Sequence, residues 1–403
     1  MTTKKNLSPL KVPGFRAGGV ACGIKGNGKK DLAIIVSEEP AAAAAVFTTN
    51  RFKAAPVVHD MNKITSGKAQ AVFINSGSAN AATGEEGDAD AGSMAEIAAK
   101  CLRIDSSLVL VASTGSIGSR LPMDKIAKGA PLLADGLNGE EDGLMQAAEA
   151  ITTTDRFIKT AGRRFTIDGK DVSLCGIAKG AGMIEPDMAT MLAFFMTDAA
   201  IEQSVLSRMF KKAVDQSFNT ITVDGCMSTN DTALILANGR AGNRPLQVRS
   251  ANGQIFLEAL LETAIELAAM IVRDGEGATK LIDITVDGAR NRTEARRIAY
   301  AVGRSNLVKT AFFGGDANWG RIISAAGSVG IPIDPRRLTL YFEDCLIFTH
   351  GQGVGGNEKK LREIMKRDTV SIRIKLAEGS GTFRVFASDL THDYVDINAL
   401  YHT

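Results

Sequence analysis

Residues 179–197 join a constrained loop to a buried strand, and this combination restricts the fold more than any other stretch of the chain. Gly180 and Gly182 permit positive φ angles and close backbone approach. Pro186 then fixes φ in a tight turn. The apolar run at 191–196 is long enough for a fully buried strand. The sequence therefore predicts that an irregular loop leads directly into the interior of a sheet.

Thr190 places a lone hydroxyl at the head of that strand, directly after the small residue Ala189. If the bond between these two residues is cut, Thr190 becomes an N-terminal residue. Its hydroxyl is then the nucleophile, and its own α-amine is the adjacent base. A free α-amine titrates near pH ~7.7, so much of it can accept a proton at neutral pH. The alternative is a turn followed by a core strand whose first residue happens to be a threonine.

Further blocks occur in order along the chain: 75–81 (NSGSANA), 113–118 (STGSIG), 274–280 (DGEGATK), 316–321 (DANWGR) and the tail 394–403 (YVDINALYHT). Together with residues 179–192, they resemble the ornithine acetyltransferase family, whose members include bifunctional glutamate N-acetyltransferases. A chance match of one block is plausible, whereas a chance match of all of them is not.

The resemblance implies a set of functional residues. Thr190 is the nucleophile after self-cleavage between Ala189 and Thr190, and Thr114 and Gly115 form the oxyanion hole. The residues assigned to substrate contact are Thr153, Lys179, Thr190, Glu276, Asn398 and Thr403. Asp187 departs from the family pattern, which more usually has Asn at this position. The extra carboxylate could alter self-cleavage or the basicity of the amine.

Three of these sites also have an interpretation from the residues themselves. Thr114 and Gly115 follow a predicted strand, where a hydroxyl and an N–H can point into one spot. An ordinary strand-to-helix turn is the alternative. Lys179 could bind a substrate carboxylate or polarise an oxyanion, or be a solvated loop lysine. Glu276, between two glycines, could receive the amine of ornithine, or be a surface residue at a helix end.

The implied reaction is a ping-pong acetyl transfer. Thr190 takes the acetyl group from N2-acetylornithine, and the α-amine of glutamate then attacks the acetyl-threonine ester. No cofactor is implied, although bifunctional members also accept acetyl-coenzyme A. The resemblance further implies that the α and β fragments of the cleaved chain assemble as a heterotetramer, two of each.

Two other functions fit the same residues. An N-terminal-nucleophile amidase or aminopeptidase would use water in place of glutamate. An uncleaved, non-enzymatic ligand-binding protein would make no use of the Thr190 hydroxyl.

The composition argues against several other classes. Apolar residues make up 45% of the chain and the formal net charge is +2, which predicts a globular protein without an electrostatic footprint for nucleic acid. The five cysteines are scattered without a CxxC pair and no HExxH motif occurs, so no metal site is expected. No GxSxG motif occurs either, which argues against a serine hydrolase. The sequence lacks a signal-peptide pattern and a long apolar segment, so we expect a cytoplasmic protein outside the membrane.

The order of predicted elements indicates an α/β protein. Strands are predicted at 31–36, 45–48, 71–74, 108–112, 220–223 and 233–236, a hairpin at 164–175, and a long amphipathic helix at 254–272. For the larger part of the chain, the resemblance implies a layered αββα sandwich, similar to that of N-terminal nucleophile hydrolases.

The pattern of predicted strands and helices changes after Leu281, which predicts two domains. We place a larger catalytic domain at 1–285 and a smaller C-terminal α/β domain at 286–403, whose tail returns to the active site. The apolar tail residues Val395, Ile397, Leu400 and Tyr401 are expected to pin that tail by burial.

Overall fold

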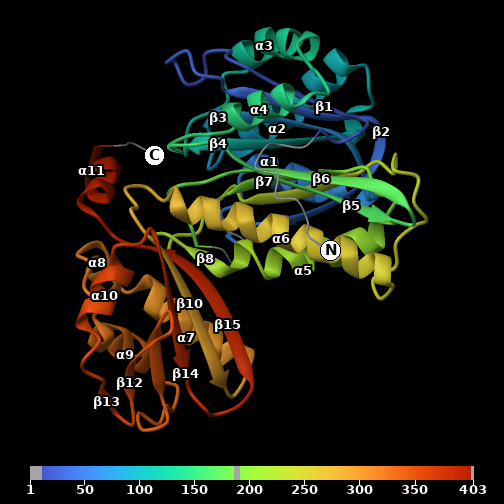
Figure 1. The fold of residues 1–403 in the computed structure, drawn as a ribbon. Helices are drawn as coiled ribbons and strands as arrows, with labels where there is room; N and C mark the ends of the chain where they lie inside the picture. The colour runs from blue at the N-terminus through green and yellow to red at the C-terminus, as the bar shows by residue number, and fades with distance from the viewer. Residues whose placement is uncertain (1–10, 186–190, 401–403) are drawn as a thin grey trace.

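The chain forms two sheets, each flanked by helices (Figure 1). The computed structural model describes residues 11–185 and 191–400. The first sheet has the strand order β4-β3-β2-β9-β7-β6-β5, with β1 paired to β2. Its strands are β1 Phe15–Val20, β2 Leu32–Phe47, β3 Lys68–Ser78, β4 Val109–Ser116, β5 Lys159–Ile167, β6 Lys170–Lys179, β7 Leu192–Thr197 and β9 Thr232–Ala237.

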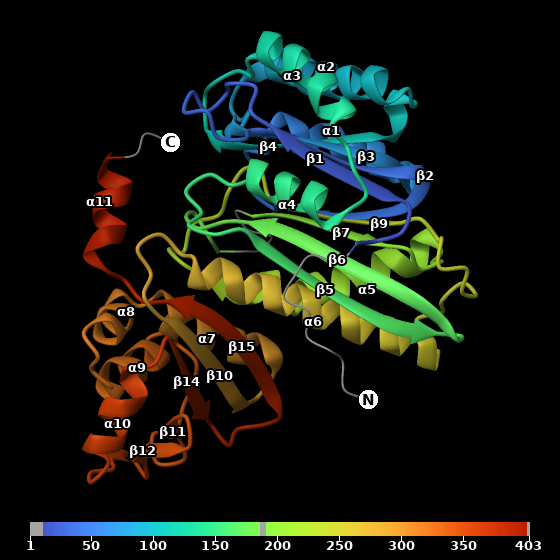
Figure 2. The ribbon, with the colours of Figure 1, turned by 45° about the horizontal axis from the view of Figure 1, so that its top comes forward.

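Six helices accompany this first sheet in the part of the chain that the structure describes. They are α1 Ala55–Lys63, α2 Gly84–Leu102, α3 Met123–Asp135, α4 Glu141–Ala150, α5 Gln203–Asp215 and α6 Ala251–Arg273, with short 3-10 turns at Ile64–Ser66, Ser106–Leu108 and Phe218–Thr220. Helices α2 and α3 lie on one side, and α5 and α6 lie on the other (Figure 2).

Strand β2 folds the sheet into two layers. Its first half pairs with β1 and β3, and its second half, from Ala42 to Phe47, pairs with β9. The register shifts between Val36 and Ala41, at an exposed bend. The prediction of two separate strands here is therefore wrong, because a single strand of 16 residues continues through a bulge.

An apolar core fills the space between the two layers. Side chains of β2, β3, β4 and α4 meet side chains of β6, β7 and β9 in one buried cluster. Two further clusters lie between the layers and their covering helices. The order helix, sheet layer, sheet layer, helix confirms the predicted αββα sandwich.

The second sheet has the order β13-β12-β11-β14-β10-β15-β8. Its strands are β8 Ile221–Thr222, β10 Leu281–Ala289, β11 Thr339–Phe342, β12 Cys345–Thr349, β13 Gln352–Gly353, β14 Thr369–Lys375 and β15 Gly381–Ser388. The helices of this part are α7 Arg292–Arg304, α8 Asn306–Phe313, α9 Trp319–Gly327, α10 Glu358–Met365 and α11 His392–Leu400. Helix α7 packs on β10 and β15 (Figure 1).

The loop between β8 and β9 passes from one sheet to the other. Strand β8 pairs in parallel with β15 of the second sheet, although β9 lies in the first. The sequence predicted both strands, but nothing in it indicated that they belong to different sheets. The proposed domain boundary at 285/286 falls inside β10, and this division stays a prediction.

Strand β7 lies in the middle of the first sheet, and all six of its residues are buried. It is antiparallel to β6 and parallel to β9. The end of β6 at Lys179 therefore meets the starts of β7 and β9 at one edge. The predicted β5–β6 hairpin is confirmed, with Asp168 and Gly169 at φ 52° and 72° in its two-residue turn.

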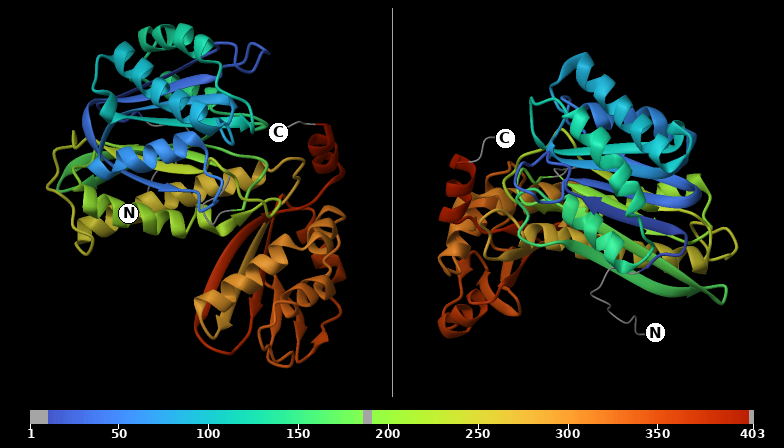
Figure 3. Two further views of the ribbon diagram at one scale, coloured as in Figure 1. Left: turned by 180° about the vertical axis from the view of Figure 1, so that it is seen from behind. Right: turned by 90° about the horizontal axis from the view of Figure 1, so that it is seen from above.

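Helix α11 projects from the body of the molecule near this edge (Figure 3). The expectation that apolar residues bury and pin the tail is wrong for the described residues, because Val395 is 59% exposed and Leu400 is 84% exposed. Ile397 is also exposed, and Tyr401 lies outside the described residues. Polar contacts hold the helix instead, as described below. Across residues 11–185 and 191–400, no helix is long and apolar enough to cross a membrane.

Candidate functional site

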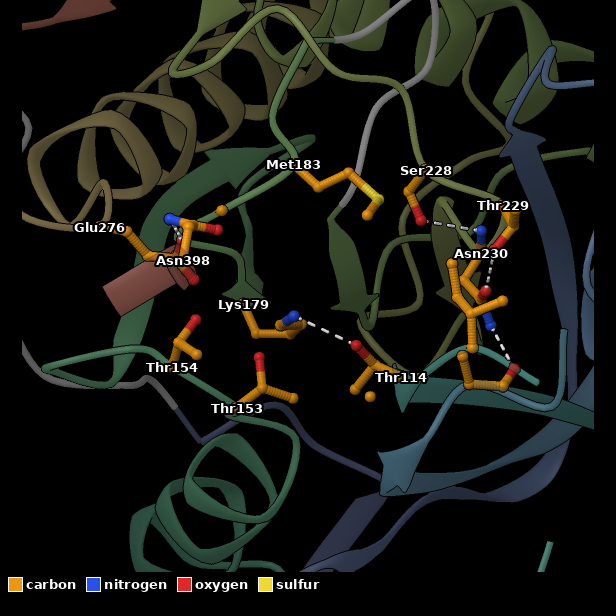
Figure 4. A pocket seen from close by; sticks show the side chains of 14 residues that line it. Thr114, Thr153, Thr154, Lys179, Met183, Ser228, Thr229, Asn230, Glu276 and Asn398 are labelled. Atoms are coloured by element: carbon orange, nitrogen blue, oxygen red, sulfur yellow. Dashed lines mark hydrogen bonds between the residues drawn. The ribbon is translucent and has the colours of Figure 1, made fainter. Parts of the chain in front are cut away.

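A pocket opens at the edge where β4, β6 and the chain after α6 come together (Figure 4). Its lining combines small, hydroxyl-bearing and charged side chains. The described residues that line it are Ala79, Thr114, Gly115, Ile117, Thr153, Thr154, Lys179, Gly182, Met183, Ser228, Thr229, Asn230, Glu276 and Asn398.

Thr114 and Gly115 lie inside β4, near its end, and not in a turn after it. The strand runs to Ser116 because its last residues stay paired with β3. Gly115 has a φ of 135°, and a Cβ there would lie 2.3 Å from the carbonyl carbon of Gly77. Only glycine permits this close approach of the two strands. The backbone that follows Thr114 is thus fixed at the pocket edge.

Lys179 ends β6 and points its ammonium at the Thr114 hydroxyl. The side chain is buried, and Nζ donates to Thr114 Oγ1 over 3.1 Å (Figure 4). A lysine ammonium is a donor only, so the hydroxyl hydrogen of Thr114 stays free to donate to another atom. Burial lowers the pKa of Lys179, although nearby carboxylates favour the charged form. The pair can thus present two donors to one developing negative charge.

Glu276 faces the pocket from the loop after α6. Its Oε2 accepts a hydrogen bond of 2.9 Å from Asn398 Nδ2 of α11, whose amide also donates to the Tyr394 carbonyl at 3.0 Å. The Glu276 carboxylate packs against Gly182, where a Cβ would lie only 2.4 Å from Oε2. Helix α11 therefore contacts the pocket through a polar side chain.

The glycine loop between β6 and residue 185 is held from both sides. Asp155 Oδ1 accepts from the Gly180 N–H at 2.8 Å. Asp224 accepts from the N–H groups of Met183 and Ile184 at 2.6 and 2.9 Å. Gly180 has a φ of 153°, a positive value that was predicted from the glycine at this position. The loop is therefore a fixed wall of the pocket.

The structure brings most of the residues predicted from the sequence into this single pocket. They are Thr114, Gly115, Thr153, Lys179, Glu276 and Asn398. Ala189 and Thr190, with Asp187 in the same segment, and the C-terminal Thr403 lie outside the described residues. The chain enters that segment after Glu185 and leaves it at Met191, whose N–H donates to Asp231 Oδ1 at 3.0 Å.

Comparison with known proteins places these residues in a family. The model of the ArgJ family matches residues 16–403. The chain belongs to the ArgJ family. The protein from Geobacter sulfurreducens named "Arginine biosynthesis bifunctional protein ArgJ" is 49% identical over 395 residues, which cover 98% of this chain and 100% of that protein. The protein of the same name from Caldanaerobacter subterraneus is 46% identical, with 97% of each chain covered.

A solved structure agrees with this assignment. The arginine biosynthesis bifunctional protein argJ of Bacillus halodurans is 40% identical with a TM-score of 0.50. The match covers 52% of this chain and 98% of the solved one. The ornithine acetyltransferase resemblance inferred from the sequence blocks is thus confirmed at the level of the ArgJ family.

This ArgJ-family pocket also contains residues that sequence reasoning missed. Ser228, Thr229 and Asn230 line it from the loop before β9. Asn230 Nδ2 donates to the carbonyls of Ala79 and Ser113 at 2.6 and 2.9 Å, which joins this loop to β4. The polar run between two predicted strands was visible in the sequence, but nothing in it indicated which partners it would meet.

No metal site is apparent in this part of the ArgJ-family fold. Among the residues that the structure describes, no group of three His, Cys, Asp or Glu side chains could hold a metal ion. The polar side chains that line the described pocket carry hydroxyl, ammonium, carboxylate and amide groups.

Proposed function

We propose that this ArgJ-family chain is an acyltransferase of arginine biosynthesis that moves the acetyl group of N2-acetylornithine to L-glutamate. The acetyl group is carried as an ester on Thr190 after self-cleavage of the Ala189–Thr190 bond, in the segment outside the described residues. Membership of the ArgJ family supports this proposal, as do relatives whose names place them in arginine biosynthesis.

The observation that carries the proposal is the arrangement of charge in the pocket. Lys179 and the Thr114 hydroxyl lie on one side, and the Glu276 carboxylate lies on another (Figure 4). N2-acetylornithine has an acetyl carbonyl, an α-carboxylate and a cationic side-chain amine. The carbonyl or carboxylate suits the cationic side, and the amine suits Glu276. Gly182 and Met183, which line this pocket, lead along the chain towards the segment that contains Thr190.

In the first half-reaction, the Thr190 hydroxyl attacks the acetyl carbonyl while its α-amine accepts the hydroxyl proton. The tetrahedral intermediate places negative charge on the former carbonyl oxygen, where Thr114, the Gly115 N–H and Lys179 can stabilise it. The C–N bond then breaks, ornithine leaves with the proton, and an acetyl ester remains on Thr190.

In the second half-reaction, the deprotonated α-amine of glutamate attacks the ester carbonyl. The same donors stabilise the second oxyanion, and the Thr190 oxygen leaves and regains a proton. N-acetylglutamate is released. Thr153, Asn398 and Thr403 complete the proposed substrate contacts, and the cycle requires no cofactor.

Assembly and location belong to the same proposal. Strand β7 begins two residues after Thr190 and lies buried between β6 and β9, so separating the fragments would open the core. We therefore expect fragments 1–189 and 190–403 to stay together. A heterotetramer of two α and two β fragments, located in the cytoplasm, completes this proposal.

An acetyl-transfer assay tests the proposal against its alternatives. We expect ornithine release from N2-acetylornithine to depend on glutamate, with N-acetylglutamate formed in equal amount. An amidase would release acetate at the same rate with and without glutamate. An uncleaved binding protein would show one intact band on a denaturing gel and no transfer. Either result would overturn the assignment.

Acetyl-coenzyme A is a second candidate donor, because the relatives are named as bifunctional proteins. We propose that the acetyl-Thr190 ester can also form from this thioester, with coenzyme A as the leaving group. Formation of N-acetylglutamate from acetyl-coenzyme A and glutamate, with acetylornithine absent, would establish the second activity. Release of coenzyme A only when acetylornithine is present would contradict it.

A further inference from the structure

Three charged side chains form a buried cluster next to the pocket. Lys159 Nζ contacts Asp155 Oδ1 at 2.6 Å and Asp274 Oδ2 at 2.5 Å. All three side chains are fully buried. Removing charges from water is costly, so such a cluster persists only with close pairing and further hydrogen bonds. The structure supplies those bonds, and most of them lead towards the pocket.

Asp155 joins two pocket segments. Its Oδ2 accepts from the N–H of Thr153 at 2.9 Å, and its Oδ1 accepts from the N–H of Gly180 at 2.8 Å. Thr153 lines the pocket, and Gly180 directly follows Lys179. A single carboxylate therefore fixes the positions of both segments relative to Lys159.

Asp274 adds a third segment. Its carboxylate accepts from the backbone N–H of Arg156 at 3.1 Å and from Arg156 Nε at 3.2 Å. Helix α6 ends just before Asp274, and Glu276 follows two residues later. The Asp274–Lys159–Asp155 bridge thus links the chain before Glu276 to the chain segments of Thr153 and Lys179.

We propose that Asp155, Lys159 and Asp274 are positioning residues that hold three substrate-contacting segments together, and that Asp155 supplies a negative charge that favours the Lys179 ammonium. None of the three is assigned to substrate contact. The inference rests on the proposed function, because it assumes that the Lys179 cation contributes to binding of the substrate.

The charged groups around Lys179 shift its pKa in opposite directions. Burial lowers the pKa of Lys179, and the charged groups that act on it are Asp155, Lys159, Asp231 and Glu276. Lys25 is also close enough to interact with it electrostatically. The three carboxylates favour the ammonium, whereas Lys159 disfavours it. Neutralising Asp155 should therefore lower the pKa of Lys179, and removing the charge of Lys159 should not.

Two variants separate this role from a merely structural one. Asp155→Asn and Lys159→Met both disrupt the buried cluster, so both should lower the melting temperature. The substrate N2-acetylornithine has no group that titrates between about pH 6 and 9, because its α-nitrogen is acylated. A change of its KM in this range therefore reports on the protein.

We expect KM for N2-acetylornithine to rise with pH as Lys179 loses its proton. Asp155→Asn should shift this rise to lower pH. At a pH above both rises, KM should then exceed the wild-type value by about tenfold for each pH unit that the rise has moved. In Lys159→Met the rise should stay at the wild-type pH or move higher. Lys159→Arg, which keeps the charge, should retain the wild-type profile. Glu266→Gln is a matched control, because Glu266 pairs with Arg163 of the same strand as Lys159.

A rise at lower pH in both Asp155→Asn and Lys159→Met, or an unmoved rise in Asp155→Asn, would overturn the inference. If Lys159→Met does not fold, Asp155→Asn against Glu266→Gln still decides it, since both exchanges are nearly isosteric. An inactive wild-type chain would remove the proposed function and this inference together. An active wild type with equal pH profiles in both cluster variants would remove the inference alone.

Discussion

Gly182 lies against the carboxylate that we propose receives the amine of ornithine. A Cβ at this position would lie 2.4 Å from Glu276 Oε2 and 2.5 Å from its Cδ. The atoms in the way belong to the far end of a flexible side chain, so a substitution should displace Glu276 without disrupting the backbone. The absence of a side chain at Gly182 therefore determines which position the Glu276 carboxylate can occupy.

We expect Gly182→Ala to raise KM for N2-acetylornithine by about ten- to a hundredfold, because a charge-assisted contact of roughly 1.5–3 kcal/mol is lost. Unfolding midpoints should change little. Gly92→Ala is the control, since Gly92 lies within α2 and a Cβ there meets no atom within 4 Å. Steady-state kinetics with acetylornithine measure the effect. An unchanged KM in Gly182→Ala would remove Glu276 from the substrate pocket.

Single residues with a local motif were the part of the site that the sequence predicted best. Thr114, Lys179 and Glu276 stand in short glycine-containing blocks and meet in one pocket. The buried cluster behind them was not predicted, because Lys159 and Asp274 are 115 residues apart and neither stands in a recognisable pattern. A charged residue is expected to be exposed until its partner is known.

Helix α11 depends on polar contacts where it meets the body of the molecule. Thr391 Oγ1 donates to the Gly277 carbonyl at 2.7 Å, and Asn398 Nδ2 donates to Glu276 at 2.9 Å. Asn398 is exposed, so its bond to Glu276 competes with water. Helix α11 thus holds the Glu276 carboxylate in position through Asn398, which lies on the exposed side of the pocket.

We expect Asn398→Ala to raise KM for N2-acetylornithine by roughly five- to tenfold, the effect of losing about 1 kcal/mol from one hydrogen bond to a carboxylate. The turnover number should change less, because Asn398 does not contact the proposed oxyanion donors. Asp396→Ala, two residues earlier on the same exposed helix, should leave both constants unchanged. Equal effects in the two variants would show that the helix acts only through its folding.

The predicted elements were most accurate where turn chemistry is local. The β5–β6 hairpin follows from Asp168 and Gly169, which suit a two-residue turn. The prediction divided β2 into strands at 31–36 and 45–48, and Glu38, Glu39 and Pro40 lie between them. Pairing with β9 carries the strand past them, and this tertiary effect leaves no local signal.

Apolar clusters stabilise the part of the molecule built on the first sheet, and this part also contains a buried carboxyl group, that of Asp60. Asp60 of α1 accepts from the Val111 N–H at 2.9 Å and faces His59. Among the described residues, its Oδ2 has no hydrogen-bond partner. Burial raises the pKa of Asp60 to about 6, against the hydrogen bonds and charges of its neighbours.

A folded-state pKa above the unfolded value means that the protonated form of Asp60 favours the folded state. This contribution is complete below about pH 4 and is lost as the pH rises through about 6. We expect Asp60→Asn, which stays neutral, to gain up to about 3 kcal/mol relative to wild type between pH 4 and 7.5. Denaturant unfolding at both pH values measures this gain. The exposed Asp88→Asn is the control, and an equal gain in it would contradict the assignment.

At the scale of the molecule, the sequence predicted the α/β class and the resemblance predicted the layering, and both are confirmed. The tail was predicted to be pinned by apolar burial, whereas Val395 and Leu400 are exposed. An apolar residue near a chain end says little about what surrounds it, because that depends on the final packing of both sheets.

Mass spectrometry of the protein during turnover can detect the acetyl ester on Thr190 itself. The chain is incubated with N2-acetylornithine, quenched and measured intact. We predict fragments 1–189 and 190–403, with 190–403 heavier by one acetyl group located on Thr190, and loss of that acetyl group when glutamate is added. An uncleaved chain with full transfer activity, or a cleaved chain that turns over without an acetylated Thr190, would contradict it.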